Sequence, residues 1–267
     1  MEDYKTIANN ARKKTLEMIH KAGTSHIGSN FSCVDILAVL FSKLNLDKHL
    51  KKDRDRFVLS KGWAAASLYY FLSEKGIIPK RDLETYCQPG SNYLGLAETE
   101  IRGVEVAGGA MGHGLPVALG MALAAKLENA KWKTYVLMSD GELDCGTTWE
   151  CAALASHHNL HNLILIIDCN GFQAMGAKHD VLNMEPLADK WKAFNWDVVE
   201  IDGHHYNQIS KALSRKKTNK QKPLVIIART TKGKGVSFFE GKLEWHYKNV
   251  DQENYQKALT ELHQHEG

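Results

Sequence analysis

The chain has 267 residues, which is enough to bury the core of one large domain or of two small ones. Hydrophobic residues make up 43% and charged residues 24%, an ordinary globular balance, and a formal net charge of +3 does not indicate a nucleic-acid-binding surface. Five cysteines without a CxxC pair, no apolar run of about 18 residues and no signal-peptide core argue against a disulfide framework, a zinc site and a membrane span, and favour the cytoplasm.

The first half of the chain mixes helical patterns with one short strand. Residues 4–22 place apolar residues among charges at helical spacing, and Gly23 provides a stop. We then expect a mostly buried helix starting near Ser32, a strand, a helix closed by Gly76, a short polar helix, and a glycine-rich loop leading into a small-residue helix, in that order, at residues 32–44, 55–62, 63–76, 80–88 and 104–130.

The second half alternates strand and helix patterns regularly. Strands are predicted at residues 133–140, 162–170, 196–202 and 222–230, and helices at residues 147–160, 185–195, 207–216 and 252–263. The basic run at 214–222 is interpreted as a solvated helix end and loop. Residues 162–170 are apolar almost throughout, as expected when both faces of a sheet are covered. The alternation predicts an α/β fold with a doubly wound, mainly parallel sheet and helices on both faces.

Two polar side chains stand where predicted strands end. Asp140 and Asn170 each follow an apolar run, and ligands of open parallel sheets bind beyond the carboxyl ends of the strands. A carboxylate and an amide oxygen are hard ligands that suit Mg²⁺ or Ca²⁺, with a diphosphate completing the coordination. Gly141 would let the backbone turn closely beneath a phosphate, and the helix expected next would direct unpaired N–H groups at the anion.

Two other interpretations of these turns have to be weighed. An Asp-Gly pair alone is more often a strand-to-helix turn in which the Asp caps the helix, but its pairing with Asn170 across a whole strand–helix–strand unit favours a metal site. The hypothesis of a nicotinamide-binding Rossmann fold has less support, because GGAMGHG does not show the GxGxxG spacing directly after a strand.

A resemblance to a known family rests on several separate motifs. An acidic DG turn, about 30 residues and then an Asn after an apolar strand are similar to the thiamine diphosphate signature. The segments SHIGS, DRFVLSKG, GVEVAGGAMGHGL, NLILIIDCN and ARTTKGKGVSFFEGKLEWH resemble the transketolase family in order and spacing, over nearly the whole chain. The resemblance implies that residues 1–267 form a single domain that binds the diphosphate of thiamine diphosphate.

The resemblance also assigns residues to a cofactor site. Asp140 and Asn170 match two side-chain ligands of Mg²⁺ (or Ca²⁺ or Mn²⁺), and the backbone carbonyl of Phe172 matches the third. The positions implied to contact thiamine diphosphate are Gly109, Met111, Ser139, Asp140, Gly141, Asn170, Trp63 and His113.

The histidines divide into three groups. His26 in SHIGS and His246 in EWHYK match two active-site histidines associated with proton movement and phosphate contact, so we predict both as catalytic. His113 stands where the family often has Gln, and it either lines the cofactor loop or caps the next helix. We expect the remaining histidines to be surface or turn residues, including His157, His158, His161, His204 and His205.

Four positions depart from the family pattern. Trp63 and Leu96 stand where histidines contact the diphosphate and the donor sugar. Cys145 replaces an acidic residue that joins a network across the subunit interface, and Ser139 replaces a glycine. Apolar groups in place of two polar contacts suggest a different donor, such as pyruvate, or a lost activity, because sites select sugars by satisfying their hydroxyl groups.

The family's pyrimidine-binding domain supplies the Glu that activates the cofactor, and it follows this domain in single-chain members. The 267 residues leave no room for that domain. We therefore expect a separate partner chain, the C-terminal, pyrimidine-binding transketolase-like subunit, in an assembly with two copies of each chain.

Three functions stay open on this basis. The first is a subunit of a thiamine diphosphate- and Mg²⁺-dependent transferase that moves a two-carbon ketol unit from a ketose (phosphate) to an aldehyde or ketone. The second is decarboxylating acyl transfer from pyruvate or another 2-oxo acid to a sugar carbonyl. The third is a non-catalytic partner that binds the cofactor without turnover.

Overall fold

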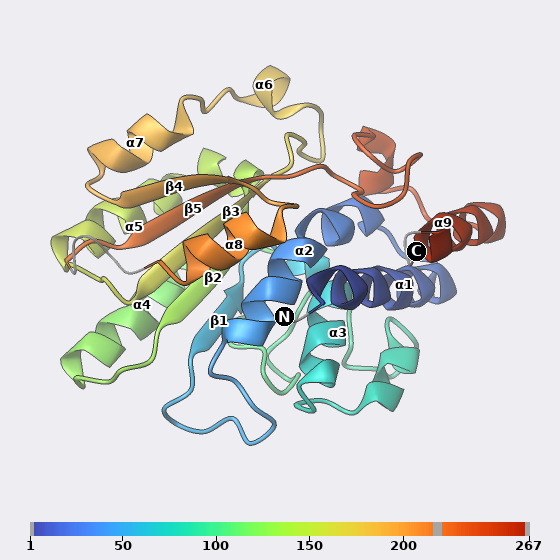
Figure 1. Cartoon of the computed structure of the whole chain (residues 1–267), viewed down its shortest axis with the longest axis horizontal. Coiled ribbons are helices and arrows are strands. Elements are labelled where there is room, and N and C mark those ends of the chain that lie inside the picture. Colours follow the sequence, from blue (N-terminus) through green and yellow to red (C-terminus); the bar gives the residue numbers. More distant parts are fainter. Residues whose placement is uncertain (1–2, 216–220, 265–267) are drawn as a thin grey trace.

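Five parallel strands form one sheet within residues 3–215 and 221–264, which are the residues that the computed structural model describes. The strands are β1 (Arg56–Leu59), β2 (Thr134–Ser139), β3 (Leu163–Cys169), β4 (Asp197–Asp202) and β5 (Leu224–Arg229). Their order across the sheet is β1-β2-β3-β5-β4, and each neighbouring pair is parallel. The predicted parallel α/β sheet is therefore confirmed (Figure 1).

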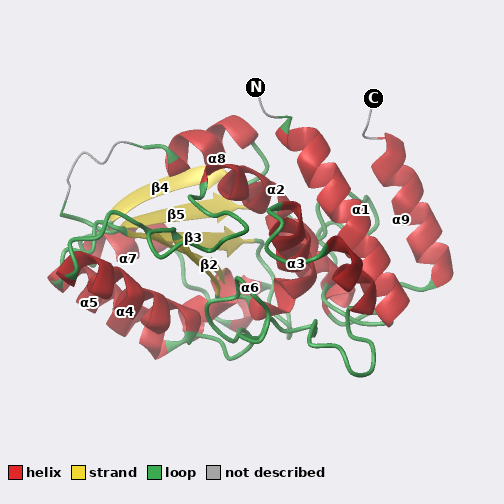
Figure 2. Cartoon of the chain, turned by 90° about the horizontal axis from the view of Figure 1, so that it is seen from below, coloured by secondary structure: helices red, strands yellow, loops and turns green. Residues whose placement is uncertain are grey.

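Helices cover both faces of this sheet, as Figure 2 shows. On one side lie α4 (Gly114–Leu127), α5 (Gly146–His157) and α7 (Leu187–Ala193). On the other side α2 (Ile27–Lys43) packs with α8 (Tyr206–Leu213), α1 (Tyr4–Ala22) and α3 (Ala65–Glu74). The C-terminal helix, α9 (Gln252–Gln264), packs against α1. A short helix, α6 (Lys178–Val181), lies in the segment between β3 and α7.

Alternate residues of each strand enter different hydrophobic cores, because successive side chains of a strand point to opposite faces. On β3, Ile164 and Ile166 pack with α1, α2 and α8, whereas Leu165 and Ile167 pack with α4, α5 and α7. All seven residues of β3 are buried. The nearly unbroken apolar run that predicted this strand thus reflects the burial of both faces.

One predicted helix start was wrong, and one predicted contact of a helix N-terminus was displaced. The helix expected from near Ser32 begins at Ile27, because the polar side chains that interrupt its first turns find buried partners: the side chain of Asn30, for example, accepts the N–H of Ser67 (3.0 Å). The helix predicted at residues 147–160 is α5, which begins at Gly146, and Asp140–Asp144 before it form a 3₁₀ turn, η3. The unpaired N–H groups of α5 are therefore displaced from the end of β2.

Other predicted features have mixed outcomes. The polar helix predicted near residue 80 is a 3₁₀ helix, η2 (Lys80–Thr85), and α6 was not predicted. Part of the basic run at 214–222 lies outside the described residues. All five cysteines are free within the described chain, and none of its helices has the length and apolar character to cross a bilayer.

Candidate active site

A cavity of about 350 Å³ opens at the carboxyl ends of β2 and β3. Its wall contains nine of the predicted site residues: His26, Trp63, Gly109, Met111, Ser139, Gly141, Asn170, Phe172 and His246. It also contains residues that were not predicted for the site: Ser29, Gln173, Ala174, Met175 and Tyr247. Asp140 lies between two of the lining residues, Ser139 and Gly141. Segments from both ends of the chain therefore meet at one edge of the sheet.

Asp140 is almost fully buried, and only one of its two carboxylate oxygens is hydrogen bonded. Oδ2 accepts the N–H of Gly171 (3.0 Å), whereas Oδ1 is buried and has no hydrogen-bond partner among the described residues. Burial raises the pKa of this carboxyl group to about 6. A buried acceptor of this kind is unfavourable unless something else binds it.

A hard cation fits this arrangement. The side-chain oxygen of Asn170 accepts the N–H of Phe172 (3.1 Å), which fixes that amide beside the Asp140 turn. Within the described residues no cluster of three His, Cys, Asp or Glu side chains could hold a metal, so a site here would use one carboxylate, one amide and a backbone carbonyl. A Cβ atom on Gly141 would come no closer than 3.4 Å to its neighbours, so the fold itself does not require glycine at this position of the wall.

A buried ion pair lies behind this wall and was not predicted. The ammonium group of Lys61 donates to Asp168 and to the carbonyl of Ser29 (2.9 Å), and both charged side chains are fully buried. Asp168 also accepts the hydroxyl groups of Ser32 (2.6 Å) and Thr230. Burial alone would raise the pKa of Asp168, but the neighbouring Lys61 holds it below its ordinary value. An acidic residue inside the otherwise apolar β3 was the sequence signal for this pair.

The Lys61–Asp168 pair orients Asn170, the predicted metal ligand two residues after Asp168. The amide nitrogen of Asn170 donates to Ser32 (3.4 Å) and to Asp168 (3.5 Å). Because the nitrogen is held on the side of the ion pair, the amide oxygen remains for the opposite side, toward the Asp140 turn.

The two predicted catalytic histidines lie against each other in the cavity. The rings of His26 and His246 are 5.1 Å apart in an edge-to-face arrangement. The backbone N–H of His26 also donates to the backbone carbonyl of His246 (2.9 Å). His26 has a φ of 72°, which is uncommon for a residue other than glycine and is typical of functional sites. The exposed ring of Tyr247 packs near both histidines.

A buried lysine fixes the state of His246. The ammonium group of Lys232 donates to Nδ1 of His246 (3.0 Å) and to the hydroxyl of Ser29 (3.1 Å). Nδ1 is therefore an acceptor, which places the proton of the neutral ring on Nε2. Burial, followed by the charge of Lys232, lowers the pKa of His246 to about 3, and the same two causes lower the pKa of His26 to about 4.

Both histidines should make the fold sensitive to acid. Unfolded histidine has a pKa of about 6.5, so between about pH 6.5 and 4 the unfolded chain binds more protons than the folded chain at these positions. We expect the free energy of unfolding to fall as the pH is lowered through this range. Urea unfolding at pH 7 and pH 4.5 measures the effect. His26→Asn, which tolerates a positive φ, should reduce it, and equal pH dependence in both proteins would contradict the assignment.

The glycine-rich loop reaches the cavity through a very close backbone contact. A Cβ atom on Gly62 would lie 2.3 Å from the backbone of Gly108, so glycine is required at both positions where these two segments of the chain cross. Ala97 bridges them, because its N–H donates to Gly62 (3.3 Å) and its carbonyl accepts the N–H of Gly108 (2.7 Å). This crossing places Trp63, Leu96 and Gly109 side by side on the apolar part of the wall.

Glu142 also was not predicted, although it joins three elements beneath the cavity. Its carboxylate accepts the hydroxyl of Ser60, the N–H of Ser139 (2.8 Å) and the N–H of Gly112 (3.4 Å). The ends of β1 and β2 and the glycine-rich loop are thereby held together, and burial raises the pKa of this carboxyl group.

The surroundings of His113 and His204 differ from what the sequence suggested. His113 is exposed, stands at the N-cap of α4 without making a side-chain cap bond, and does not belong to the described lining of the cavity, so its role at the cofactor stays a prediction. His204 lies in a turn, as expected, but its side chain is only 15% exposed and both ring nitrogens are hydrogen bonded.

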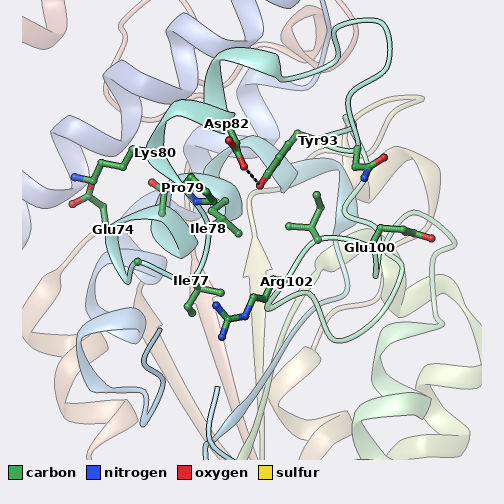
Figure 3. A pocket seen from close by; sticks show the side chains of 13 residues that line it. Glu74, Ile77, Ile78, Pro79, Lys80, Asp82, Tyr93, Glu100 and Arg102 are labelled. Atoms are coloured by element: carbon green, nitrogen blue, oxygen red, sulfur yellow. Dashed lines mark hydrogen bonds and ion pairs between the residues drawn. The ribbon is translucent and has the colours of Figure 1, made fainter. Parts of the chain in front are cut away.

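A larger hollow of about 850 Å³ lies elsewhere, between α3, η2 and residues 92–102 (Figure 3). Four of its polar side chains form two pairs: Tyr93 donates to Asp82 (3.0 Å), and Lys80 forms an ion pair with Glu74 (2.7 Å). Within the described chain none of the predicted site residues lines it. We therefore place the site in the smaller cavity, where polar groups converge.

Comparison with known proteins identifies the family of the chain. Residues 4–265 match the family described as "Transketolase, thiamine diphosphate binding domain". The chain belongs to the transketolase family. It is 40% identical to a protein of Phocaeicola vulgatus that is named as one subunit of apulose-4-phosphate transketolase (94% of this chain, 90% of that protein). It is 38% identical to the 6-deoxy-6-sulfo-D-fructose transketolase subunit SqwG of a Clostridium species (97% and 96%).

The fold is also that of solved transketolases. The transketolase of Campylobacter jejuni superposes with a TM-score of 0.92 at 34% identity, over 98% of this chain and 43% of that chain. The chain thus spans less than half of that transketolase, but nearly all of the two relatives named as subunits. The predicted thiamine diphosphate-binding fold is confirmed.

Proposed function

We propose that this chain is the diphosphate-binding subunit of a two-subunit transketolase that moves a two-carbon ketol unit from a ketose (phosphate) donor to an aldehyde or ketone acceptor. The observation that carries the proposal is the unpartnered Oδ1 of Asp140 beside Asn170 at the cavity of a transketolase fold. The proposal includes the prediction that residues 1–267 form a single domain that binds thiamine diphosphate. A cytoplasmic location fits the free cysteines.

The lining of the cavity supports the predicted cofactor contacts. Asp140, Asn170 and the carbonyl of Phe172 would hold Mg²⁺ (or Ca²⁺ or Mn²⁺), and Gly141 would be among the residues that contact the diphosphate. When bound, thiamine diphosphate supplies the electron sink that a C–C bond cleavage needs. The remaining steps belong to the protein side chains.

The chain's own residues would then orient the donor and move protons. His246 presents an Nε2–H because Lys232 occupies its other nitrogen, so it can donate a hydrogen bond to a donor oxygen. The pKa of His26, lowered to about 4, keeps this ring neutral and able to accept a hydroxyl proton near pH 7. Trp63 and Leu96 would exclude water from the same cavity.

The partner proposed is a pyrimidine-binding chain. Relatives of similar length are named subunits, which supports a divided enzyme. The apolar α4 leaves Val117 and Leu127 exposed (44% and 75%), and on the neighbouring α5 Leu154 is exposed (47%). A helix that is apolar on all sides is normally covered, which supports a subunit interface over α4 and α5 in the proposed assembly with two copies of each subunit.

The division of the site predicts that the isolated chain has no transketolase activity. We expect no ketol transfer from a ketose phosphate by the pure chain with thiamine diphosphate and Mg²⁺, and turnover after addition of its pyrimidine-binding partner subunit, because neither half alone completes the cofactor site. The partner alone is the control, and native mass spectrometry would report the stoichiometry. Turnover by the pure chain would disprove the divided site.

Two alternatives are decided by the same reconstituted complex. The apolar side chains of Trp63 and Leu96 in the cavity favour decarboxylating acyl transfer from a 2-oxo acid, so pyruvate should be compared with ketose phosphates as donor. A non-catalytic partner would bind the cofactor without turning over either donor.

A further inference from the structure

His204 connects two buried elements that lie outside the cavity wall. Its turn follows β4 and leads into α8, which packs against α2. The ring nitrogen Nδ1 is 2.8 Å from the carboxylate of Asp35 on α2, and Nε2 accepts the N–H of Thr231 (2.8 Å). His204 thus spans from the core of the helical layer to the loop that follows β5.

The hydrogen bonds determine which nitrogen of His204 carries the proton. Because Nε2 accepts an N–H, the proton lies on Nδ1 and is donated to Asp35. Asp35 is anchored in turn, since Arg12 donates to both of its oxygens (3.0 and 2.6 Å) and Tyr206 donates to one of them (2.9 Å). Nε2 of His204 is therefore held in a fixed position, where it accepts the N–H of Thr231.

The loop that receives this contact carries Lys232. Thr231 precedes Lys232 directly, and the carbonyl of Lys234 accepts Nε of Arg12 (2.8 Å), so the same cluster holds the backbone on both sides of Lys232. The contact is close: a Cβ atom on Gly203 would lie 2.4 Å from Thr230. Lys232 itself is 1% exposed and binds Ser29 and His246, which both line the cavity.

We infer that His204 is a positioning residue of the active site, which acts through the N–H of Thr231 to set the ammonium group of Lys232 behind Ser29 and His246. The inference concerns the geometry of one loop and rests on the proposed function only for its effect on cofactor binding. It predicts that losing the hydrogen bond from Thr231 to Nε2 disturbs Lys232, even when the hydrogen bond from Nδ1 to Asp35 is kept.

Two substitutions separate them. The amide oxygen of His204→Gln reaches the position of Nε2 and can still accept the N–H of Thr231, whereas the amide nitrogen of His204→Asn reaches the position of Nδ1 and can only donate to Asp35. We expect His204→Gln to bind thiamine diphosphate with Mg²⁺ within about threefold of wild type, and His204→Asn to bind at least about tenfold more weakly. Calorimetry on the full chain with its partner subunit measures both.

A second readout does not depend on the cofactor. Reductive methylation followed by mass spectrometry reports the accessibility of Lys232, and we expect several-fold faster labelling in His204→Asn with no change in His204→Gln. Equal labelling and equal affinity in all three proteins, or equal losses in both variants, would overturn the inference. If the wild type binds no cofactor, the proposed function fails while the labelling still decides the role of His204. If His204→Asn does not fold, a tenfold loss in His204→Gln would overturn the inference by itself.

Discussion

Replacing Asp140 by Asn is expected to abolish binding of Mg²⁺ and thiamine diphosphate without destabilising the chain. The variant keeps the shape of the side chain and an oxygen for the N–H of Gly171. It loses the charge that a divalent cation requires, so we expect affinity to fall at least about 100-fold. Calorimetry of the complex with the partner subunit measures this loss.

The same substitution should leave the apo chain as stable as wild type or more stable. Burial raises the pKa of Asp140 to about 6, so above pH 6 the folded chain holds an unfavourable buried charge that a neutral amide removes. We expect a gain of roughly 1–2 kcal/mol at pH 8 in urea unfolding. A stability gain with lost function is typical of a site selected for its ligand.

A matched control is Glu150→Gln, which removes an exposed carboxylate from α5 on the same side of the sheet. It should change neither affinity nor stability by a measurable amount. Retained cofactor affinity in Asp140→Asn would show that the metal binds elsewhere. A clear loss of stability would show that Oδ1 has a structural partner in solution.

Breaking the Lys61–Asp168 pair is expected to destabilise the chain most. Both side chains are fully buried, and Asp168 also accepts two hydroxyl groups. Asp168→Ala would leave an ammonium group without a counter-charge in the core, a change that costs about 3–5 kcal/mol in comparable sites. Urea unfolding of the apo chain measures the loss.

The double variant Lys61→Met with Asp168→Leu tests the cause of that loss. If the unpaired charge is responsible, removing both charges should restore at least half of the lost stability, because apolar residues of similar volume can replace buried ion pairs. A loss below about 1 kcal/mol in Asp168→Ala would mean that water reaches the pair. The double variant should still bind the cofactor poorly, since Asn170 loses the acceptor that orients its amide.

The sequence by itself was sufficient for the sheet and for the edge of the sheet at which Asp140 and Asn170 meet. Regular alternation of apolar strands and helices predicts the doubly wound fold, because both faces of a parallel sheet must be buried. Asp140 and Asn170 could be paired in advance, because neighbouring parallel strands bring their carboxyl ends to one edge. His26 and His246 could be related only through the family resemblance, since no local pattern links the two ends of a chain.

The tertiary structure alone decided how the charged and polar groups behind the cavity are arranged. Lys61 and Asp168 lie 107 positions apart, and local spacing does not indicate which buried cation meets which buried anion. His204 looked like an ordinary turn residue, and α2 began earlier than predicted, for the same reason. A polar group is tolerated in the interior only when a partner satisfies it, and in this chain those partners come from other elements of the fold.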